Sequence, residues 1–158
     1  MLQDQNTSDR EIVIARLINA PRELVWDAWT DLKHLEQWWG PNGFTTTTSE
    51  FAFHEGGDWI FDMIGPDGRV FPNEITFEKI VRPELITYIH GGGDDVGVTD
   101  AAFHATITFE VEGGKTLVTM KSVFKTAKQL AHVVEKYGAI EGGKQHLANL
   151  EEYVSKQM

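Results

Sequence analysis

The chain of 158 residues contains no cysteine. Disulfide bridges, thiolate nucleophiles, iron–sulfur clusters and cysteine-based zinc sites are therefore excluded. The chain also lacks any run of about 18 apolar residues, so we expect no segment that spans a membrane. Its first ten residues are polar and do not show the basic and then apolar pattern of a secretory signal, which makes a cytoplasmic location the expectation.

Positive charge is scarce in this sequence. There are 14 Lys and Arg residues against 24 Asp and Glu residues, which gives a net charge of −10. Proteins that bind nucleic acids without sequence preference neutralise phosphates with Lys and Arg, and anionic membrane surfaces attract the same residues. We therefore expect neither nucleic acid nor membrane as a partner, and we interpret the acidity as a contribution to solubility.

Compact motifs for metals and phosphates are missing as well. The histidines form no His-Glu-x-x-His pair, and the glycines form neither a dinucleotide-binding nor a Walker loop. A metal could in principle gather His90, Asp94, Asp95, Asp100 and His104. The glycines among them favour a solvated, mobile hairpin loop instead. We expect no metal site and no cofactor.

The length and composition that are present predict one folded domain. Hydrophobic residues make up 41% of the chain and aromatic residues 11%, as in globular proteins. We interpret residues 1–10 as a flexible N-terminal tail and residues 11–158 as a single domain.

The first third of the domain predicts a strand followed by two short helices. The strand covers Glu11–Ile18 and the first helix Arg22–Trp29, with Pro21 in its first turn and Asn19 or Ala20 as its cap. The second helix is capped by Asp31 and stops at Gly40-Pro41.

From Gly43 to Phe124 the pattern changes to short alternating segments separated by turn residues. The tetrapeptide Gly65-Pro66-Asp67-Gly68 is typical of a hairpin turn, and Phe103–Glu112 alternates apolar and polar residues. This texture predicts an antiparallel meander. Glu74 lies in an apolar neighbourhood within it, where a solvent-facing position is favoured over a buried acid.

The last third predicts two helical segments, Thr126–Tyr137 and Ala139–Lys156, separated near Gly138. One face of the second segment is expected to be buried, because its apolar and glycine positions recur every three or four residues. These positions are Ile140, Gly143, Leu147, Leu150 and Val154. A helix with such a face needs a large apolar partner, and the concave face of the meander is the candidate.

Several aromatic residues fall where they could face the interior of the sheet: Trp38, Trp39, Phe44, Trp59, Phe61, Phe71, Phe103 and Phe124. Ordinary core packing accounts for most of them. A cavity is the alternative, because Gly142-Gly143 costs the long helix about 1 kcal/mol per glycine relative to alanine. The missing side chain at Gly143 leaves room for a close backbone approach or for a ligand.

Three sequence blocks resemble a known family. Asn19–Asp31, His34-Leu35 and Trp38-Trp39-Gly40-Pro41 are similar to the SRPBCC superfamily, and more narrowly to its AHSA-type family, the homologues of the activator of the 90-kDa heat-shock chaperone's ATPase. Later landmarks are Gly57-Asp58-Trp59, the Gly65–Gly68 turn and Gly142–Leu150. The family more often has Gly-Trp where this chain has Gly142-Gly143.

The resemblance implies an α+β helix-grip fold: a curved antiparallel sheet of about six or seven strands around a long C-terminal helix, with two short helices after the first strand. It also implies a tunnel for an apolar ligand between sheet and helix. The superfamily includes carriers, hormone receptors, cyclases and co-chaperones, so the fold alone does not select a function.

The leading hypothesis is a non-catalytic carrier or sensor of a small hydrophobic or amphipathic ligand. The candidate ligand-binding residues are Trp38, Trp39, Trp59, Phe61, Met63, Phe71, Asn73, Tyr88, Met120, Phe124, Gly143, His146, Leu147 and Leu150. Two alternatives stay open. One is a cyclase or dehydratase-like enzyme that uses a pocket histidine or carboxylate, and the other is stimulation of a chaperone ATPase. Contacts with a chaperone or a second copy of the chain are likewise left open.

Overall fold

The computed structural model describes residues 7–92 and 102–158, which form a seven-stranded antiparallel sheet and four helices. The helices are α1 (Arg22–Thr30), α2 (Leu32–Trp38), α3 (Ala127–Tyr137) and α4 (Ala139–Ser155). The strands are β1 (Glu11–Ile18), β2 (Thr45–Phe51), β3 (Asp58–Ile64), β4 (Val70–Val81), β5 (Leu85–Gly92), β6 (Phe103–Glu112) and β7 (Lys115–Val123).

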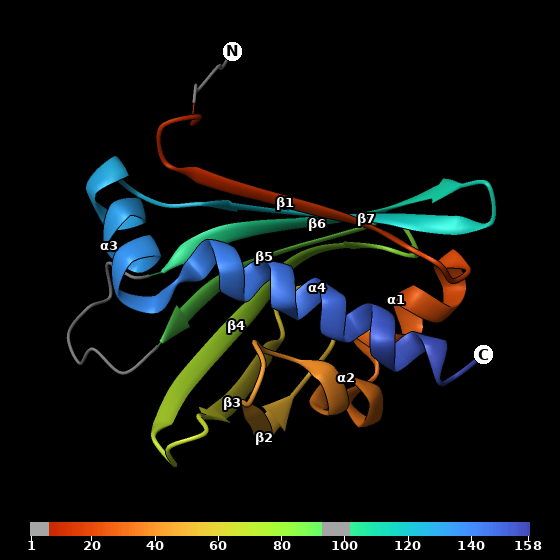
Figure 1. The fold of residues 1–158 in the computed structure, drawn as a ribbon, viewed down its shortest axis with the longest axis horizontal. Coiled ribbons are helices and arrows are strands. Elements are labelled where there is room, and N and C mark those ends of the chain that lie inside the picture. Colours follow the sequence, from red (N-terminus) through yellow and green to blue (C-terminus); the bar gives the residue numbers. More distant parts are fainter. Residues whose placement is uncertain (1–6, 93–101) are drawn as a thin grey trace.

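The strand order is β1-β7-β6-β5-β4-β3-β2, so β2 to β7 form a meander and β1 closes the far side by pairing with β7. Figure 1 shows α4 running across one face of the sheet, with α3 near its N-terminal end and α1 near its C-terminal end. The expected helix-grip fold is therefore confirmed. The bounds of β1 agree with the prediction, and Gly138 separates α3 from α4 with a positive φ of 61°.

The start of α1 differs from the expectation. Pro21 is itself the N-cap, because it keeps an extended ψ of 149° and its carbonyl accepts the first hydrogen bonds, from the N–H groups of Leu24 and Val25. The prediction that Asn19 or Ala20 caps the helix was wrong. The cap of α2 agrees with the prediction, since the Asp31 side chain accepts a hydrogen bond from the Lys33 N–H at 3.1 Å.

Residues 1–6 of the expected tail lie outside the described residues. Arg10 is held by Phe124: its carbonyl accepts the Phe124 N–H at 2.8 Å, and its guanidinium donates to the Phe124 carbonyl at 2.7 Å. The described end of the tail is thus attached where β1 runs beside β7.

The C-terminal half of α4 lies on a densely packed part of the core, which we call the packed end. Leu147, Leu150 and Val154 are completely buried there. They share the core with four aromatic residues of α1, α2 and β6, namely Trp26, Trp29, Trp38 and Phe109. The rings meet edge to face at centroid distances of 5.1 to 5.8 Å, an arrangement that adds to the stabilisation from buried area.

The first turn of α4 does not follow the predicted pattern. Ile140 is 42% exposed, although its spacing from Leu147 places it near the buried face. Ile140 does not line the cavity below α4, although its neighbours Ala139 and Glu141 do, so its side chain lies outside both the cavity and the packed end. The predicted burial of Ile140 was therefore wrong.

Among residues 7–92 and 102–158, no helix is both long enough and apolar enough to cross a membrane.

Candidate functional site

A cavity of about 620 Å³ lies between the N-terminal half of α4 and the sheet. Its walls come from six strands, from α3 and α4, and from the segment that follows α2. The described residues that line it are Ile12, Ile14, Trp39, Gly40, Pro41, Asn42, Phe44, Met63, Phe71, Asn73, Tyr88, His90, Gly91, Phe103, Ile107, Met120, Ser122, Phe124, Val133, Gly138, Ala139, Glu141, Gly142, Gly143, Gln145 and His146. Asn42, Gly138 and Glu141 are exposed and mark its mouth.

Gly143 determines how closely α4 approaches β1. A Cβ atom at this position would collide with the Cδ1 atom of Ile14, the flexible end of a side chain that also lines the cavity. At the neighbouring Gly142, a Cβ atom would make only ordinary contact with Pro41, at 3.9 Å. The two glycines are therefore not equivalent, and only Gly143 is needed for the close approach.

The segment Trp39–Phe44 forms one wall of the cavity and is fastened to α4 by three hydrogen bonds. The Gly40 N–H donates to Nδ1 of His146 at 3.1 Å, and the Asn42 N–H donates to Oε1 of Gln145 at 3.0 Å. The side-chain amide of Asn149 donates to the Gly40 carbonyl at 2.9 Å. Gly40 has a φ of 100°, a conformation that side chains other than glycine rarely adopt.

His90 and Asn73 form a polar pair on neighbouring strands of the cavity wall. Nε2 of His90 lies 2.9 Å from Oδ1 of Asn73, whose amide nitrogen donates to the Phe71 carbonyl at 2.8 Å. Because the amide oxygen can only accept, Nε2 of His90 carries the proton. Burial lowers the pKa of His90 to about 4, so the ring is neutral at neutral pH.

His146 lies where the cavity meets the packed end. Its ring packs edge-on against Trp39, Trp38 and Trp29, with centroid distances of 4.4, 4.8 and 5.5 Å. Burial, together with the influence of His90, lowers the pKa of His146 to about 3. Burial also raises the pKa of Tyr88 far above its usual value, so all three cavity groups are uncharged at neutral pH.

Most of the predicted ligand residues line the cavity: Trp39, Met63, Phe71, Asn73, Tyr88, Met120, Phe124, Gly143 and His146. Whether they bind a ligand stays a prediction. Five others do not line it, namely Trp38, Trp59, Phe61, Leu147 and Leu150. Leu147 and Leu150 belong to the packed end with Trp38. Trp59 and Phe61 stack at 3.9 Å, and Trp39 packs edge-on against both, so Trp39 forms the wall in their place.

His90 was missed as a cavity residue, because it was considered only as a member of a possible metal group beside a solvated loop. Its alternation with Tyr88 could have found it, since residues two apart on a strand share a face. By the same rule, Ile12 shares a face of β1 with Ile14, and Ser122 shares a face of β7 with Met120. His104 pairs in register with Ile89 and bonds Glu78 on the other face, so His90 and His104 do not converge.

The remaining members of the metal hypothesis, Asp94, Asp95 and Asp100, lie outside the described residues. Within the described ranges, no group of three or more His, Asp or Glu side chains could hold a metal ion. Glu74 is exposed, as its solvent-facing interpretation required.

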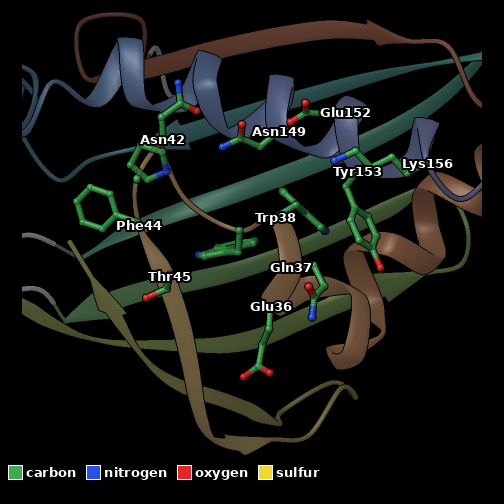
Figure 2. Close-up of a pocket in the computed structure, with 13 residues that line it drawn as sticks. Glu36, Gln37, Trp38, Asn42, Phe44, Thr45, Asn149, Glu152, Tyr153 and Lys156 are labelled. Carbon is green, nitrogen blue, oxygen red and sulfur yellow. The ribbon is translucent and has the colours of Figure 1, made fainter. Parts of the chain in front are cut away.

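A second pocket, of about 390 Å³, lies on the other side of the Trp39–Phe44 segment. Figure 2 shows Gln37, Asn149, Glu152 and Lys156 around it, between α2 and the C-terminal part of α4. Its rim is more polar than the wall of the cavity, so it is the less suitable place for an apolar ligand.

The sequence model of one family, described as "Activator of Hsp90 ATPase homolog 1-like protein", matches residues 19–155. The chain belongs to the AHSA1 family. The match to the AHSA1 model includes every described cavity residue except Ile12 and Ile14.

Solved structures of similar proteins share the AHSA1-type fold. A protein from Arthrobacter aurescens is 27% identical with a TM-score of 0.87, over 97% of this chain and 90% of that one. A protein from Staphylococcus epidermidis is 25% identical with a TM-score of 0.79, over 100% and 96% of the two chains. An AHSA1 protein from Silicibacter pomeroyi, 18% identical, has a TM-score of 0.74 over 94% and 99%, which shows the fold alone. No curated protein sequence matches the chain.

Proposed function

We propose that this protein binds a small hydrophobic or amphipathic molecule in the cavity between α4 and the sheet, as a carrier or sensor. The observation that carries the proposal is the cavity itself: about 620 Å³, walled mostly by apolar and aromatic side chains. Ligand sites in proteins typically have this size, with a few polar groups that fix orientation. Asn73, Tyr88, His90 and His146 supply such groups here.

The decisive experiment fills the cavity with a large side chain attached to α4. We expect Gly143→Trp to abolish binding of the neutral fluorescent probe 1-aminoanthracene, because the indole occupies the space beneath α4 while Ile14 moves aside. The matched control is Gly142→Ala, whose added methyl group contacts only Pro41. Circular dichroism checks that both variants are folded.

Unchanged probe binding in folded Gly143→Trp would overturn the proposed site. Native mass spectrometry of the purified protein, followed by extraction of any bound compound, then identifies the natural ligand. We expect a bound compound to be absent from Gly143→Trp prepared in the same way.

Acid–base catalysis is a second candidate, favoured by the two histidines that face the cavity with displaced pKa values. Their low pKa values make them weak bases, which weighs against this role. The test is exchange of the α-hydrogens of 2-decalone with deuterium oxide, followed by NMR. Catalysis would speed the exchange in the wild-type protein and not in His90→Phe, whereas equal rates would exclude His90 as the base.

The family description names an activator of a chaperone ATPase. A contact with such a chaperone stays a prediction for this chain, as do a homodimer and a cytoplasmic location. Measurement of the ATPase rate of a purified 90-kDa heat-shock chaperone with and without the protein would decide the first of these.

A further inference from the structure

The two cavity histidines are opposite in their hydrogen-bonding character. Nε2 of His90 carries its proton toward Asn73, so the neutral ring leaves Nδ1 as an acceptor. Nδ1 of His146 accepts the Gly40 N–H, so the neutral ring leaves Nε2–H as a donor. The protein itself fixes both tautomers, through one neighbour of each ring.

Both remaining ring nitrogens are available to a ligand. Across residues 7–92 and 102–158, the one fully buried side-chain nitrogen or oxygen atom without a partner is Nε2 of Gln129, which does not belong to the cavity. Neither Nδ1 of His90 nor Nε2 of His146 is such an atom, so neither is fully buried without a partner. Both residues line the cavity. The hydroxyl of Tyr88 joins them as a third neutral group that can donate and accept.

Formal charge is scarce on the cavity wall. Among the described lining residues, only Glu141 carries a charge, and it is exposed at the mouth. A carboxylate or ammonium group placed between the histidines would lose its hydration without gaining an opposite charge, which is costly. An uncharged oxygen group would lose less and would recover its hydrogen bonds.

We propose that the ligand is an uncharged, hydroxyl-bearing lipophile whose hydroxyl group lies between His90 and His146. The hydroxyl group donates a hydrogen bond to Nδ1 of His90 and accepts one from Nε2–H of His146. This inference rests on the proposed function and narrows it. The apolar body of the molecule lies against Phe71, Met120 and Phe124. Fatty acids and lipophilic amines whose apolar chain has the same length as that of the ligand are disfavoured, because their head groups are charged.

Calorimetric titration with four molecules of equal chain length tests this: decanol, decyl methyl ether, decanoate and decylamine. Loss of one hydrogen bond in a buried site weakens binding by roughly two- to tenfold. We expect decanol to bind that much more tightly than the ether, which accepts but cannot donate. Decanoate and decylamine are expected to bind more weakly than the ether at neutral pH.

His90→Phe removes the acceptor while it keeps a ring of similar size. In this variant we expect decanol to lose its preference over the ether, with ether binding largely retained. His104→Phe is the matched control: it makes the same change on the neighbouring strand, where His104 bonds Glu78 and does not line the cavity, so the ratio of decanol to ether affinity is expected to stay unchanged.

The outcomes separate the two proposals. If none of the four molecules binds, the proposed function fails, and this inference fails with it. If the ether or decanoate binds as tightly as decanol, the cavity binds lipophiles but the assigned head group is wrong. A preference for decanol that survives in His90→Phe would remove His90 from the recognition of the hydroxyl group.

Discussion

The two halves of α4 lie on the same sheet, but one half packs against it and the other leaves a cavity. The C-terminal half places Leu147, Leu150 and Val154 into the packed end, where each is completely buried. The N-terminal half presents Ala139, Gly142 and Gly143, which leave a cavity of about 620 Å³ below them. The sequence thus gives one helix two tasks: aliphatic side chains hold the fold together, and small residues keep space open.

The two halves also differ in their polar content. Every residue that defines the packed end is apolar or aromatic, whereas the cavity holds His90 and His146 with pKa values of about 4 and about 3. His146 stands at the boundary, because it packs on three tryptophans and also holds the Gly40 N–H. We therefore expect acid to destabilise the fold by protonating the histidines of the cavity half.

The largest expected effect is the response to acid. Between pH 6.5 and about 4 the unfolded chain binds protons at these histidines that the folded protein does not, so the free energy of unfolding falls as the pH falls. For each of the two rings, the free energy of unfolding is expected to be roughly 3 kcal/mol lower at pH 4 than at pH 7. Urea denaturation at pH 7 and at pH 4 measures it, and His90→Phe should lose the share that belongs to His90. An equal drop in both proteins would contradict the assignment.

The next effect concerns the packed end. Leu150→Ala should lower the free energy of unfolding by about 2–5 kcal/mol, because it leaves a cavity in a core that cannot collapse around it. The matched control on the same helix is Ile140→Ala, which should cost less than about 0.5 kcal/mol because Ile140 is 42% exposed. Thermal and urea unfolding give both values. Similar losses in the two variants would show that the halves of α4 do not differ as described.

These contrasts also show what the sequence could predict. The period of α4 and the alternation along β6 depend on local spacing, so the helix and the meander were accessible from the residues alone, whereas the helix-grip fold was what the resemblance to the AHSA-type family implied. Ile140 shows the limit: its spacing from Leu147 predicted burial, but it is 42% exposed, because the way in which the first turn of α4 lies on the sheet depends on residues distant in sequence.

The aromatic residues show the same limit within the site. Trp39, Trp59 and Phe61 were all expected to line the cavity, and only Trp39 does so. All three face the interior, but the stack of Trp59 on Phe61 lies behind the Trp39 ring, an order of layers that no single strand encodes. His90 was missed for a different reason: it was considered only together with the glycine-rich loop that follows it, although its alternation with Tyr88 places both side chains on one face of the strand.

A smaller effect separates the two glycines of the cavity half. Gly142→Ala should raise the free energy of unfolding by about 0.5–1 kcal/mol, because alanine favours the helix and the added methyl group makes only an ordinary contact with Pro41. Gly143→Ala gains the same helix propensity but must displace the end of Ile14, so it should be less stable than Gly142→Ala. Thermal unfolding of the pair measures the difference. A Gly143→Ala variant as stable as Gly142→Ala would show that Gly143 is not needed for the approach of α4 to β1.

The smallest effect lies outside both halves, where α4 is tied to β1 at the surface. Glu151 accepts hydrogen bonds from Nε of Arg16 at 2.8 Å and from the Asn19 N–H at 3.1 Å. Burial alone would raise the pKa of Glu151, but these bonds outweigh it and the pKa is lowered, so the stabilisation is present at neutral pH and is lost as the carboxylate takes up a proton in acid. Because the pair is partly exposed, Glu151→Gln should cost only about 0.2–1 kcal/mol, measured by urea denaturation in low salt, with a smaller cost in high salt. A larger, salt-independent loss would mean that this surface contact, and not the burial of Leu147, Leu150 and Val154 alone, holds α4 in place over the cavity.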